Sequence, residues 1–377
     1  MKAYFVSTVP TESVRDSRFD APIYLQSDDY PIPTPCKDEV VIQTILTGLC
    51  STDLKKITEG YKNFSAGIEG RRSVGSRLFL GHETVGRILA TGEGVPTSLV
   101  GKRVILHDGD SCAVFGAEEK CVNCRSGRGI FCLKKRERVF RTGEIFGGFS
   151  EYFVRHKCQI KEIGDQVSDY DAALIEPAAI ALNALISALG DQPEMSTLLV
   201  FGGGTIAQLI FRLAPFVCPR TKIFACGLKK SQREAAKQQP VTFIDDTINQ
   251  QAIFSSVIDA VGTSDSLKRS VALSAPLGYI YSIGLDADEQ MLPSRAFVQL
   301  GLTFKGVHGS VVDQNNADGR DDYDYILRLC GQSKLSLSDL ISLEVRPEKL
   351  NRAIRGVFDR LEDEDSGLFR VVARFSE

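Results

Sequence analysis

The chain has 377 residues, of which 43% are hydrophobic and 25% charged, and its formal net charge is −3. This length favours two domains over one hydrophobic core, and the balanced charge excludes the strongly basic surface of a nucleic-acid-binding protein. No run of residues has the apolar character of a signal peptide or a membrane span. We therefore expect a cytoplasmic protein without nucleic-acid or membrane partners, whose ten cysteines are thiols or metal ligands.

Short β-branched runs dominate the chain up to about residue 165. Runs such as EVVIQTIL, TVGRILATG and KRVILHDG alternate with Gly, Pro and Asp, which is typical of strands joined by turns. Cys50 follows one predicted strand, and His82 and Glu83 lie in a glycine-flanked turn. A thiolate and an imidazole from two such loops can converge on a metal ion, although either residue alone is commonly structural.

The loop between these two segments contains NFSAGIEGRRSVGSR, which carries Arg71, Arg72 and Arg77. Loops of Gly, Ser and Arg usually lie on the surface, and we interpret this one as a solvated insertion. The alternative is that the arginines contact an anionic substrate, such as a phosphorylated polyol.

Three cysteines, Cys121, Cys124 and Cys132, follow within EKCVNCRSGRGIFC and indicate a metal site. A tetrahedral zinc ion in a structural site takes four protein ligands. The fourth ligand must therefore come from elsewhere, unless the site has lost its metal and the thiols are free.

The pattern changes to helical periodicity in residues 169–189, and strands and helices alternate beyond them. STLLVFGGG, KIFACG, SSVIDAVG, YIYSIG and LTFKG are the apolar strand candidates, and such alternation predicts a doubly wound parallel sheet. From about residue 315 onward the chain has amphipathic helices and a last strand, FRVVARF, which we expect to pack on the first domain.

A dinucleotide-binding turn is predicted at the first of these strands. Gly202, Gly204 and Ala207 have the G-x-G-x-x-A spacing between an apolar strand and an amphipathic helix. The first glycine permits the tight turn, the second lets a pyrophosphate approach the backbone, and the small third residue lets helix and strand pack closely. A plain tight turn is the alternative.

The second strand of this domain favours NADP over NAD. In NAD-binding proteins an acidic residue at its end binds the ribose hydroxyls. Here the strand ends in Gly227, followed by Lys229, Lys230 and Arg233, and cationic side chains favour a 2′-phosphate. The alternative is that the lysines only begin a solvated helix.

Together these segments resemble the zinc-dependent medium-chain alcohol and polyol dehydrogenases over essentially the whole chain. The resemblance implies a catalytic zinc held by Cys50 in GLCSTD, His82 in GHE and Glu176 in a Glu-Pro pair, as in the sorbitol and glucose dehydrogenase branch. It implies further that Glu83 can approach the metal and that Asp53 orients His82.

The proton relay and the turns near the nicotinamide also follow from the resemblance. Thr52 matches the hydroxyl that passes the substrate proton outward, and Lys55 replaces the histidine that continues the relay in classical members. Val261, Gly262 and Gly284 match backbone positions close to the nicotinamide half of the cofactor.

In the same family the structural zinc lobe normally reads Cys-x2-Cys-x2-Cys-x7-Cys. Its first position falls on Glu118, so we expect Glu118, Cys121, Cys124 and Cys132 to hold a second zinc. Cys112 is the rival fourth ligand, through a longer loop.

The resulting expectation is an α/β protein with a mainly β, GroES-like catalytic domain, residues 1–177 and 308–377, and a Rossmann-type domain, residues 178–307. It is expected to be a homo-oligomeric dimer or tetramer with two zinc ions per chain, which transfers a hydride between NADP(H) and an alcohol, polyol or sugar. The alternatives are a zinc-free quinone- or enoyl-type reductase of the same fold and a non-catalytic nucleotide-binding relative.

Overall fold

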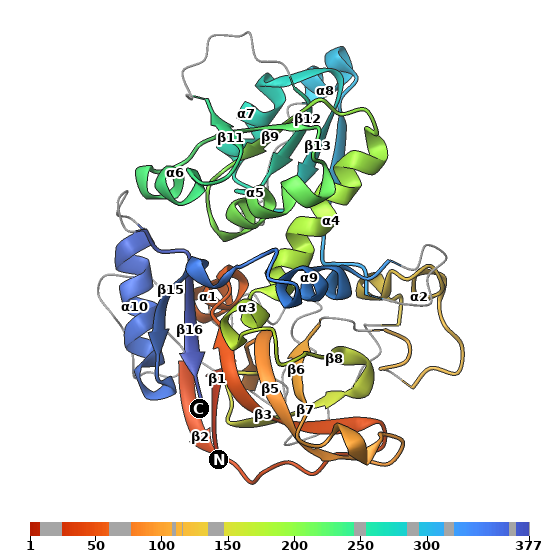
Figure 1. The fold of residues 1–377 in the computed structure, drawn as a ribbon, viewed down its shortest axis with the longest axis vertical. Helices are drawn as coiled ribbons and strands as arrows, with labels where there is room; N and C mark the ends of the chain where they lie inside the picture. The colour runs from red at the N-terminus through yellow and green to blue at the C-terminus, as the bar shows by residue number, and fades with distance from the viewer. Residues whose placement is uncertain are drawn as a thin grey trace. The chain divides into compact units, whose positions relative to one another are not determined.

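The computed structural model describes residues 1–7, 25–59, 77–107, 111–114, 116–134, 147–244, 254–284, 294–312, 320–361 and 367–376 (Figure 1). The chain forms two compact units. The first unit comprises Met1–Glu176, Val311–Asp359 and Arg370–Glu377, and the second comprises Pro177–Ser310 and Arg360–Phe369. Compared with the expected boundaries, the structure assigns a short segment near the C-terminus to the second unit.

The second unit is built on a six-stranded sheet in which all neighbouring strands are parallel. The predicted doubly wound parallel sheet is therefore confirmed. In spatial order the strands are β11 (Val241–Phe243), β10 (Lys222–Cys226), β9 (Thr197–Phe201), β12 (Phe254–Asp259), β13 (Ser274–Ser282) and β14 (Thr303–Gly306).

Helices follow most of these strands, as parallel connections require. Helix α7 packs on β12 and β13, and α8 packs on β13. The helices of this unit are α5 (Thr205–Val217), α6 (Lys230–Ala236), α7 (Ser264–Ala272) and α8 (Ser294–Leu300). The long helix α4 (Ile175–Asp191) contains the boundary between the two units.

The first unit is mainly β, as expected. Its larger sheet is antiparallel except for the pair β15 and β16. The strand order is β15 (Ile341–Val345), β16 (Arg370–Arg374), β3 (Glu39–Gly48), β5 (Glu83–Thr91), β6 (Arg103–Leu106) and β8 (Ile160–Glu162), and β7 (Tyr152–His156) also pairs with β3. A smaller sheet contains β2 (Leu25–Asp29), β1 (Lys2–Ser7) and β4 (Arg77–Phe79).

The helices of the first unit are shorter, and the predicted last strand pairs with β3 of its sheet. The helices are α1 (Ser51–Glu59), α2 (Val122–Arg125), α3 (Asp169–Ala173), α9 (Asp322–Gly331) and α10 (Leu350–Leu361). Short 3₁₀ turns lie at Thr97–Leu99, Gly129–Phe131, Lys157–Gln159, Ser338–Leu340 and Pro347–Lys349.

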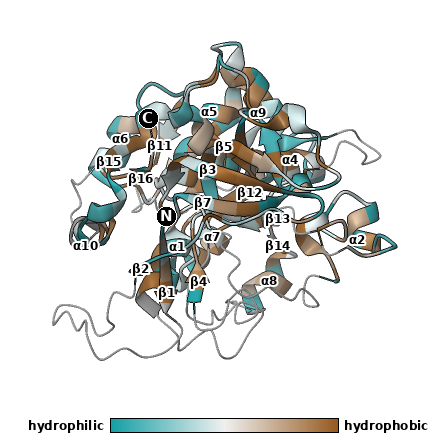
Figure 2. Ribbon diagram, turned by 90° about the horizontal axis from the view of Figure 1, so that it is seen from below, coloured by the Kyte–Doolittle hydropathy of each residue, from teal (hydrophilic) through white to brown (hydrophobic). Residues whose placement is uncertain are grey.

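Each unit has its own apolar core along the central strands, and Figure 2 shows hydrophobic residues along β3 and β12. In the first unit Val40, Ile42, Ile88 and Phe153 are buried together. In the second unit the core includes Leu199, Val257, Leu267 and Ile280, where parallel strands meet helix α7. Among the described residues, no helix is long and apolar enough to cross a membrane.

Candidate metal centre and dinucleotide turn

The two loops that carry Cys50 and His82 lie side by side because of the strand register. Gly48 at the end of β3 pairs with Glu83 at the start of β5, and the two strands are antiparallel. Cys50 follows β3 and begins the turn into α1, while His82 immediately precedes β5. The predicted convergence of these two loops is thus found in the structure.

Asp53 ties the two loops together from a buried position. Its carboxylate accepts a hydrogen bond from the Cys50 N–H at 3.2 Å and another from the Gly81 N–H at 3.4 Å. Its Oδ1 also lies 3.6 Å from Nδ1 of His82. A carboxylate beside one ring nitrogen orients the imidazole and directs the other nitrogen elsewhere.

Side chains with metal-binding atoms gather at this point. One ligand atom each from Cys50, His82 and Glu83 lies within 4.8 Å of the other two. Burial raises the pKa of the Cys50 thiol, but His82 and Arg370 more than offset this and bring it to about 6. At neutral pH Cys50 is therefore a thiolate, which is the form that binds metals.

The electrostatics of the site also favour a neighbouring imidazolium. Burial lowers the pKa of His82, but the Asp53 and Cys50 anions raise it well above the usual value. Burial raises the pKa of Asp53, but His82 lowers it below the usual value. Asp53 and the Cys50 thiolate are thus two anions beside one protonated imidazole, and a bound divalent cation would also neutralise them.

Glu83 and Glu176 supply two further carboxylates. The third residue whose ligand atom lies within 4.8 Å of those of Cys50 and His82 is Glu83, whereas Glu176 was the expected third ligand. Glu176 is buried in the first turn of α4, and its charge contributes to raising the pKa of Glu83. Burial is the largest cause of that rise. The structure thus brings Glu176 near the centre but not into its closest group.

Arg370 is the residue of this site that sequence reasoning missed. It lies in β16 and is buried, and its Nη1 is 3.1 Å from Oε1 of Glu83 and donates to the Leu49 carbonyl at 3.0 Å. Burial alone would lower its pKa, but Glu83 and Cys50 raise it. The available signal was that Arg370 is one of two arginines in the otherwise apolar run FRVVARF.

The other candidate residues of this region lie in different places. Thr52 and Lys55 lie half-buried in α1, close in sequence to Cys50. Arg71 and Arg72 lie outside the described residues. Arg77 is held by a 2.9 Å ion pair with Asp28 and a hydrogen bond to Tyr30, so its charge serves the smaller sheet.

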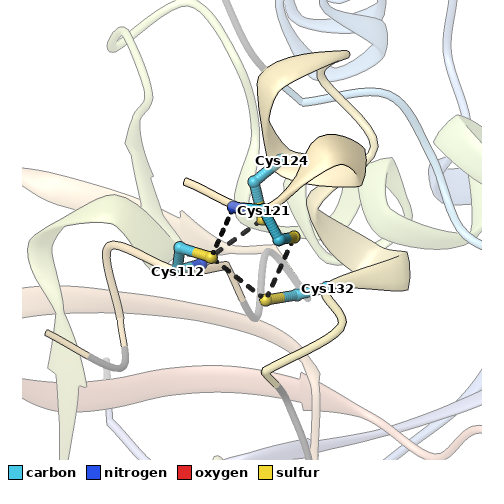
Figure 3. Close-up of side chains that lie close together, drawn as sticks. All are labelled: Cys112, Cys121, Cys124 and Cys132. Atoms are coloured by element: carbon cyan, nitrogen blue, oxygen red, sulfur yellow. Dashed lines mark hydrogen bonds between the residues drawn. The ribbon is translucent and has the colours of Figure 1, made fainter. Parts of the chain in front are cut away.

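The cysteine lobe forms a compact cluster of four sulfurs (Figure 3). The ligand atoms of Cys112, Cys121, Cys124 and Cys132 all lie within 4.8 Å of one another. The Cys112 and Cys132 sulfurs are 3.6 Å apart, and the Cys121 N–H donates to the Cys112 sulfur at 3.2 Å. Four sulfurs at this separation fit the closed tetrahedron of a structural zinc site.

Glu118, the fourth ligand favoured from the family spacing, is not part of this cluster. It is exposed, and Cys112 takes the position instead. The reason is local: the Ala117 N–H bonds to the Cys112 carbonyl at 3.0 Å, so the chain after Cys112 turns back on itself. The long spacing therefore closes without a carboxylate, and the correct pattern is Cys-x8-Cys-x2-Cys-x7-Cys.

Burial and local hydrogen bonds shift the pKa values of the lobe cysteines in different directions. Burial raises the pKa of Cys121, but the N–H groups of Cys124 and Leu133 more than offset this and bring it to about 6. Burial raises the pKa of Cys124 and of Cys132. Four sulfurs packed this closely suit a metal ion, which would bind them as thiolates.

The predicted dinucleotide turn lies between β9 and α5. Gly202 has φ +102°, a conformation that glycine adopts without strain, and a Cβ there would lie 2.6 Å from Cγ2 of Val261. A Cβ on Gly204 would meet nothing within 4 Å, so this backbone is open to a ligand. Ala207 is fully buried within α5, as close helix packing requires.

The turn after β10 carries the basic residues. Gly227 has φ +70°, and Lys229 precedes α6 as its N-cap. Lys230 is exposed, and Arg233 donates to the Leu228 carbonyl at 3.4 Å and lies over the Phe243 ring. In the described structure β10 ends without the acidic residue that NAD-binding turns carry.

Comparison with known proteins gives a consistent result. A family model described as an alcohol dehydrogenase GroES-like domain matches residues 36–165. The chain is 29% identical to the starvation-sensing protein RspB of Escherichia coli (strain K12) over 283 residues, 73% of this chain and 76% of RspB. It is 25% identical to "Probable D-xylulose reductase A" of Neosartorya fischeri, over 88% of this chain and 89% of that protein.

The fold is also similar to that of solved structures. The crystal structure of galactitol-1-phosphate dehydrogenase from Escherichia coli superposes with a TM-score of 0.76 at 21% sequence identity. The match covers 99% of this chain and 100% of that one. At this identity the likeness concerns the fold.

Proposed function

The chain belongs to the zinc-type medium-chain alcohol and polyol dehydrogenases, and from this membership we propose that it transfers a hydride between NADP(H) and an alcohol, polyol or sugar. That it is an NAD(P)-dependent alcohol or polyol dehydrogenase follows from its relatives. The preference for NADP, the ligand assignments and the substrate class are the proposal. The name of the D-xylulose reductase relative supports a polyol or sugar substrate.

The group of Cys50, His82 and Glu83 is the observation that carries the proposal; Glu83 is buried and the other two are half-buried. A thiolate, an imidazole and a carboxylate within 4.8 Å of one another form a donor set suited to zinc. Neither Glu83 carboxylate oxygen has a hydrogen-bond partner among the described residues, although both are buried. Arg370, whose Nη1 lies 3.1 Å from Oε1, compensates this carboxylate in part, and a bound metal ion would supply a further cationic partner.

In this proposal Cys50, His82 and Glu176 hold the metal, and Glu83 is the carboxylate that can approach it. Zinc bound there supplies Lewis-acid polarisation of the substrate oxygen. The chain's own residues do the rest: Asp53 keeps the His82 ring in one orientation, and Thr52 carries the substrate proton outward. Arg370 balances the Glu83 charge.

The second zinc of the proposal lies in the cysteine lobe. Cys112, Cys121, Cys124 and Cys132 would fill all four positions, so no open position remains for substrate. This site therefore holds the lobe together and takes no part in the reaction.

The cofactor preference rests on the turn after β10. A 2′-phosphate would meet Lys229 and Lys230 at the start of α6, with Arg233 one turn away. The absence of a carboxylate at the end of β10, in the part of the chain described, removes a repulsion that the phosphate would otherwise meet. The homo-oligomeric state and the cytoplasmic location stay predictions.

Turnover of a panel of alcohols, polyols and sugars with NADP and with NAD tests the proposal. We expect activity with at least one polyol, faster with NADP, that is lost after chelation and restored by zinc. Turnover that survives complete removal of zinc would favour a zinc-free reductase. Cofactor binding without any turnover would favour a non-catalytic relative.

A further inference from the structure

A single buried carboxylate organises the turns at the carboxyl ends of β12 and β13. Asp259 is the last residue of β12, and only 1% of its surface is exposed. Its Oδ1 accepts hydrogen bonds from the N–H groups of Val261 and Gly262, both at 3.0 Å. Its Oδ2 accepts from the Ser266 hydroxyl at 2.9 Å. The side chain thus fixes the turn into α7.

The backbone of the same residue fixes the neighbouring turn. The Asp259 carbonyl accepts from the N–H of Ile283 at 3.0 Å and from that of Gly284 at 3.1 Å. A second tie runs to β9, because the Ala260 N–H donates to the Phe201 carbonyl at 3.0 Å. Asp259 is therefore the residue at which the ends of β12 and β13 are joined.

The joined turns lie too close together to admit a side chain on either glycine. A Cβ on Gly262 would lie 2.3 Å from the Gly284 carbonyl carbon, and one on Gly284 would lie 2.2 Å from the Val261 carbonyl carbon. Gly262 also has φ +82°. Val261 in turn contacts the first turn of the dinucleotide motif, since a Cβ on Gly202 would lie 2.6 Å from its Cγ2. A shift of one turn must therefore move the others.

We propose that Asp259 is a positioning residue for the nicotinamide half of the cofactor. This inference rests on the proposed function, because that function puts the nicotinamide beside Val261, Gly262 and Gly284. Asp259 is buried and would act on the cofactor only through the backbone that it holds. It holds the three backbone segments in one arrangement before the cofactor arrives, so that binding does not have to order them.

The position predicts a split between the two halves of the cofactor. Removing the carboxylate leaves two N–H groups without their acceptor and loosens the turns after β12 and β13. The turn after β10, which would bind the adenosine half, contains none of Asp259's hydrogen-bond partners. Binding of intact NADPH should therefore suffer, whereas binding of adenosine 2′,5′-bisphosphate should not.

The test measures the Kd of NADPH and of adenosine 2′,5′-bisphosphate for the full chain by fluorescence and by calorimetry. In Asp259→Ala we expect the Kd of NADPH to rise about 10-fold or more, as loss of hydrogen bonds worth about 1.4 kcal/mol would cause. The Kd of the bisphosphate should change less than about twofold. Asp259→Asn keeps one oxygen acceptor for the two N–H groups and should restore NADPH binding to within about threefold.

Asp265→Ala is the matched control, because it removes an exposed carboxylate from the same end of α7 and should leave both Kd values unchanged. Equal effects of Asp259→Ala on both ligands, or no effect on either, would overturn the inference. If this variant does not fold, hydrogen exchange of the wild-type protein without cofactor decides. Slow exchange of the Val261, Gly262 and Gly284 amides supports a pre-formed arrangement, and fast exchange contradicts it. A wild-type protein that binds neither NADPH nor NADH would instead refute the proposed function.

Discussion

Among the residues of the candidate centre, Cys50 has a thiol pKa that gives a direct test of its environment. Its pKa of about 6 is below the usual thiol value because His82 and Arg370 outweigh the effect of burial. In zinc-depleted protein, alkylation of Cys50 by iodoacetamide should therefore rise with pH through a midpoint near 6, since the thiolate is the nucleophile. Mass spectrometry of the Cys50 peptide measures the rate.

His82→Ala is the comparison for this prediction. Without the imidazole, burial is less fully offset, and the midpoint should move up by at least about one pH unit. A midpoint that is the same in both proteins would show that the environment of Cys50 differs from the one described.

Gly48 is required for the approach of Glu83 to the centre. A Cβ at this position would lie 2.4 Å from Oε2 of Glu83, whose carboxylate is buried against Arg370. Gly48→Ala should displace this carboxylate and lower the free energy of unfolding by about 1–3 kcal/mol, as overpacking does. Denaturant unfolding and activity should both report the change.

Gly356→Ala is a suitable control for this variant. Gly356 lies in α10, and a Cβ there would meet nothing within 4 Å. Alanine should therefore stabilise the helix by up to about 1 kcal/mol. If Gly48→Ala is as harmless as this control, the space for Glu83 is not limiting.

Sequence reasoning found the centre by chemistry but not all of its members. Cys50 and His82 could be paired because both side chains can bind a metal and the segments that carry them resemble those of a zinc-dependent family. Arg370 could not be assigned, because its proximity depends on the pairing of β16 with β3 across more than 300 residues of chain. Side-chain chemistry is local in the sequence, whereas strand pairing is not.

At the scale of elements, the cysteine lobe shows that a loop can supply a ligand that the family's cysteine spacing does not predict. The turn after Cys112 brings its sulfur to within 3.6 Å of Cys132, which the number of intervening residues does not reveal. Cys112→Ser should therefore remove the zinc of the lobe, whereas Glu118→Gln should keep it. Zinc content per chain, measured on both purified variants, decides between the two ligands.

The thermal midpoint gives a second readout of this pair. Because metal binding contributes directly to folding, Cys112→Ser should also lower Tm, and Glu118→Gln should not. The reverse pattern, with zinc lost only from the Glu118 variant, would restore the original expectation.

The turn between β10 and α6 carries the cofactor preference. Replacing both Lys229 and Lys230 with Ala should lower kcat/KM for NADP by about 10-fold or more, because charge-assisted hydrogen bonds contribute about 1.5–3 kcal/mol each. The value for NAD should change by less than about twofold. Steady-state kinetics with one substrate and both cofactors measures this.

Lys237→Ala serves as its control, since Lys237 lies at the far end of α6 in an exposed ion pair with Glu234 at 2.6 Å. An exposed pair of this kind contributes little, so neither cofactor should be affected. Equal losses for NADP and NAD in the double variant would mean that the lysines do not bind a 2′-phosphate.

At the scale of the whole molecule, the sequence was sufficient for the fold class. The alternation of strands and helices predicted the parallel sheet of the second unit, because each βα repeat has a strand pattern followed by a helix pattern in consecutive residues. The sheet of the first unit is assembled from strands far apart in sequence, such as β3, β5 and β16. Its strands could be predicted individually, but their order could not.

The account as a whole requires two zinc sites of different kinds in one chain. Elemental analysis of the purified protein and of Cys50→Ser tests this most directly. We predict two zinc ions per wild-type chain and one in the Cys50 variant, which should keep the lobe zinc and lose activity. An equal zinc content in both proteins, or no zinc in the wild type, would contradict the proposed centre.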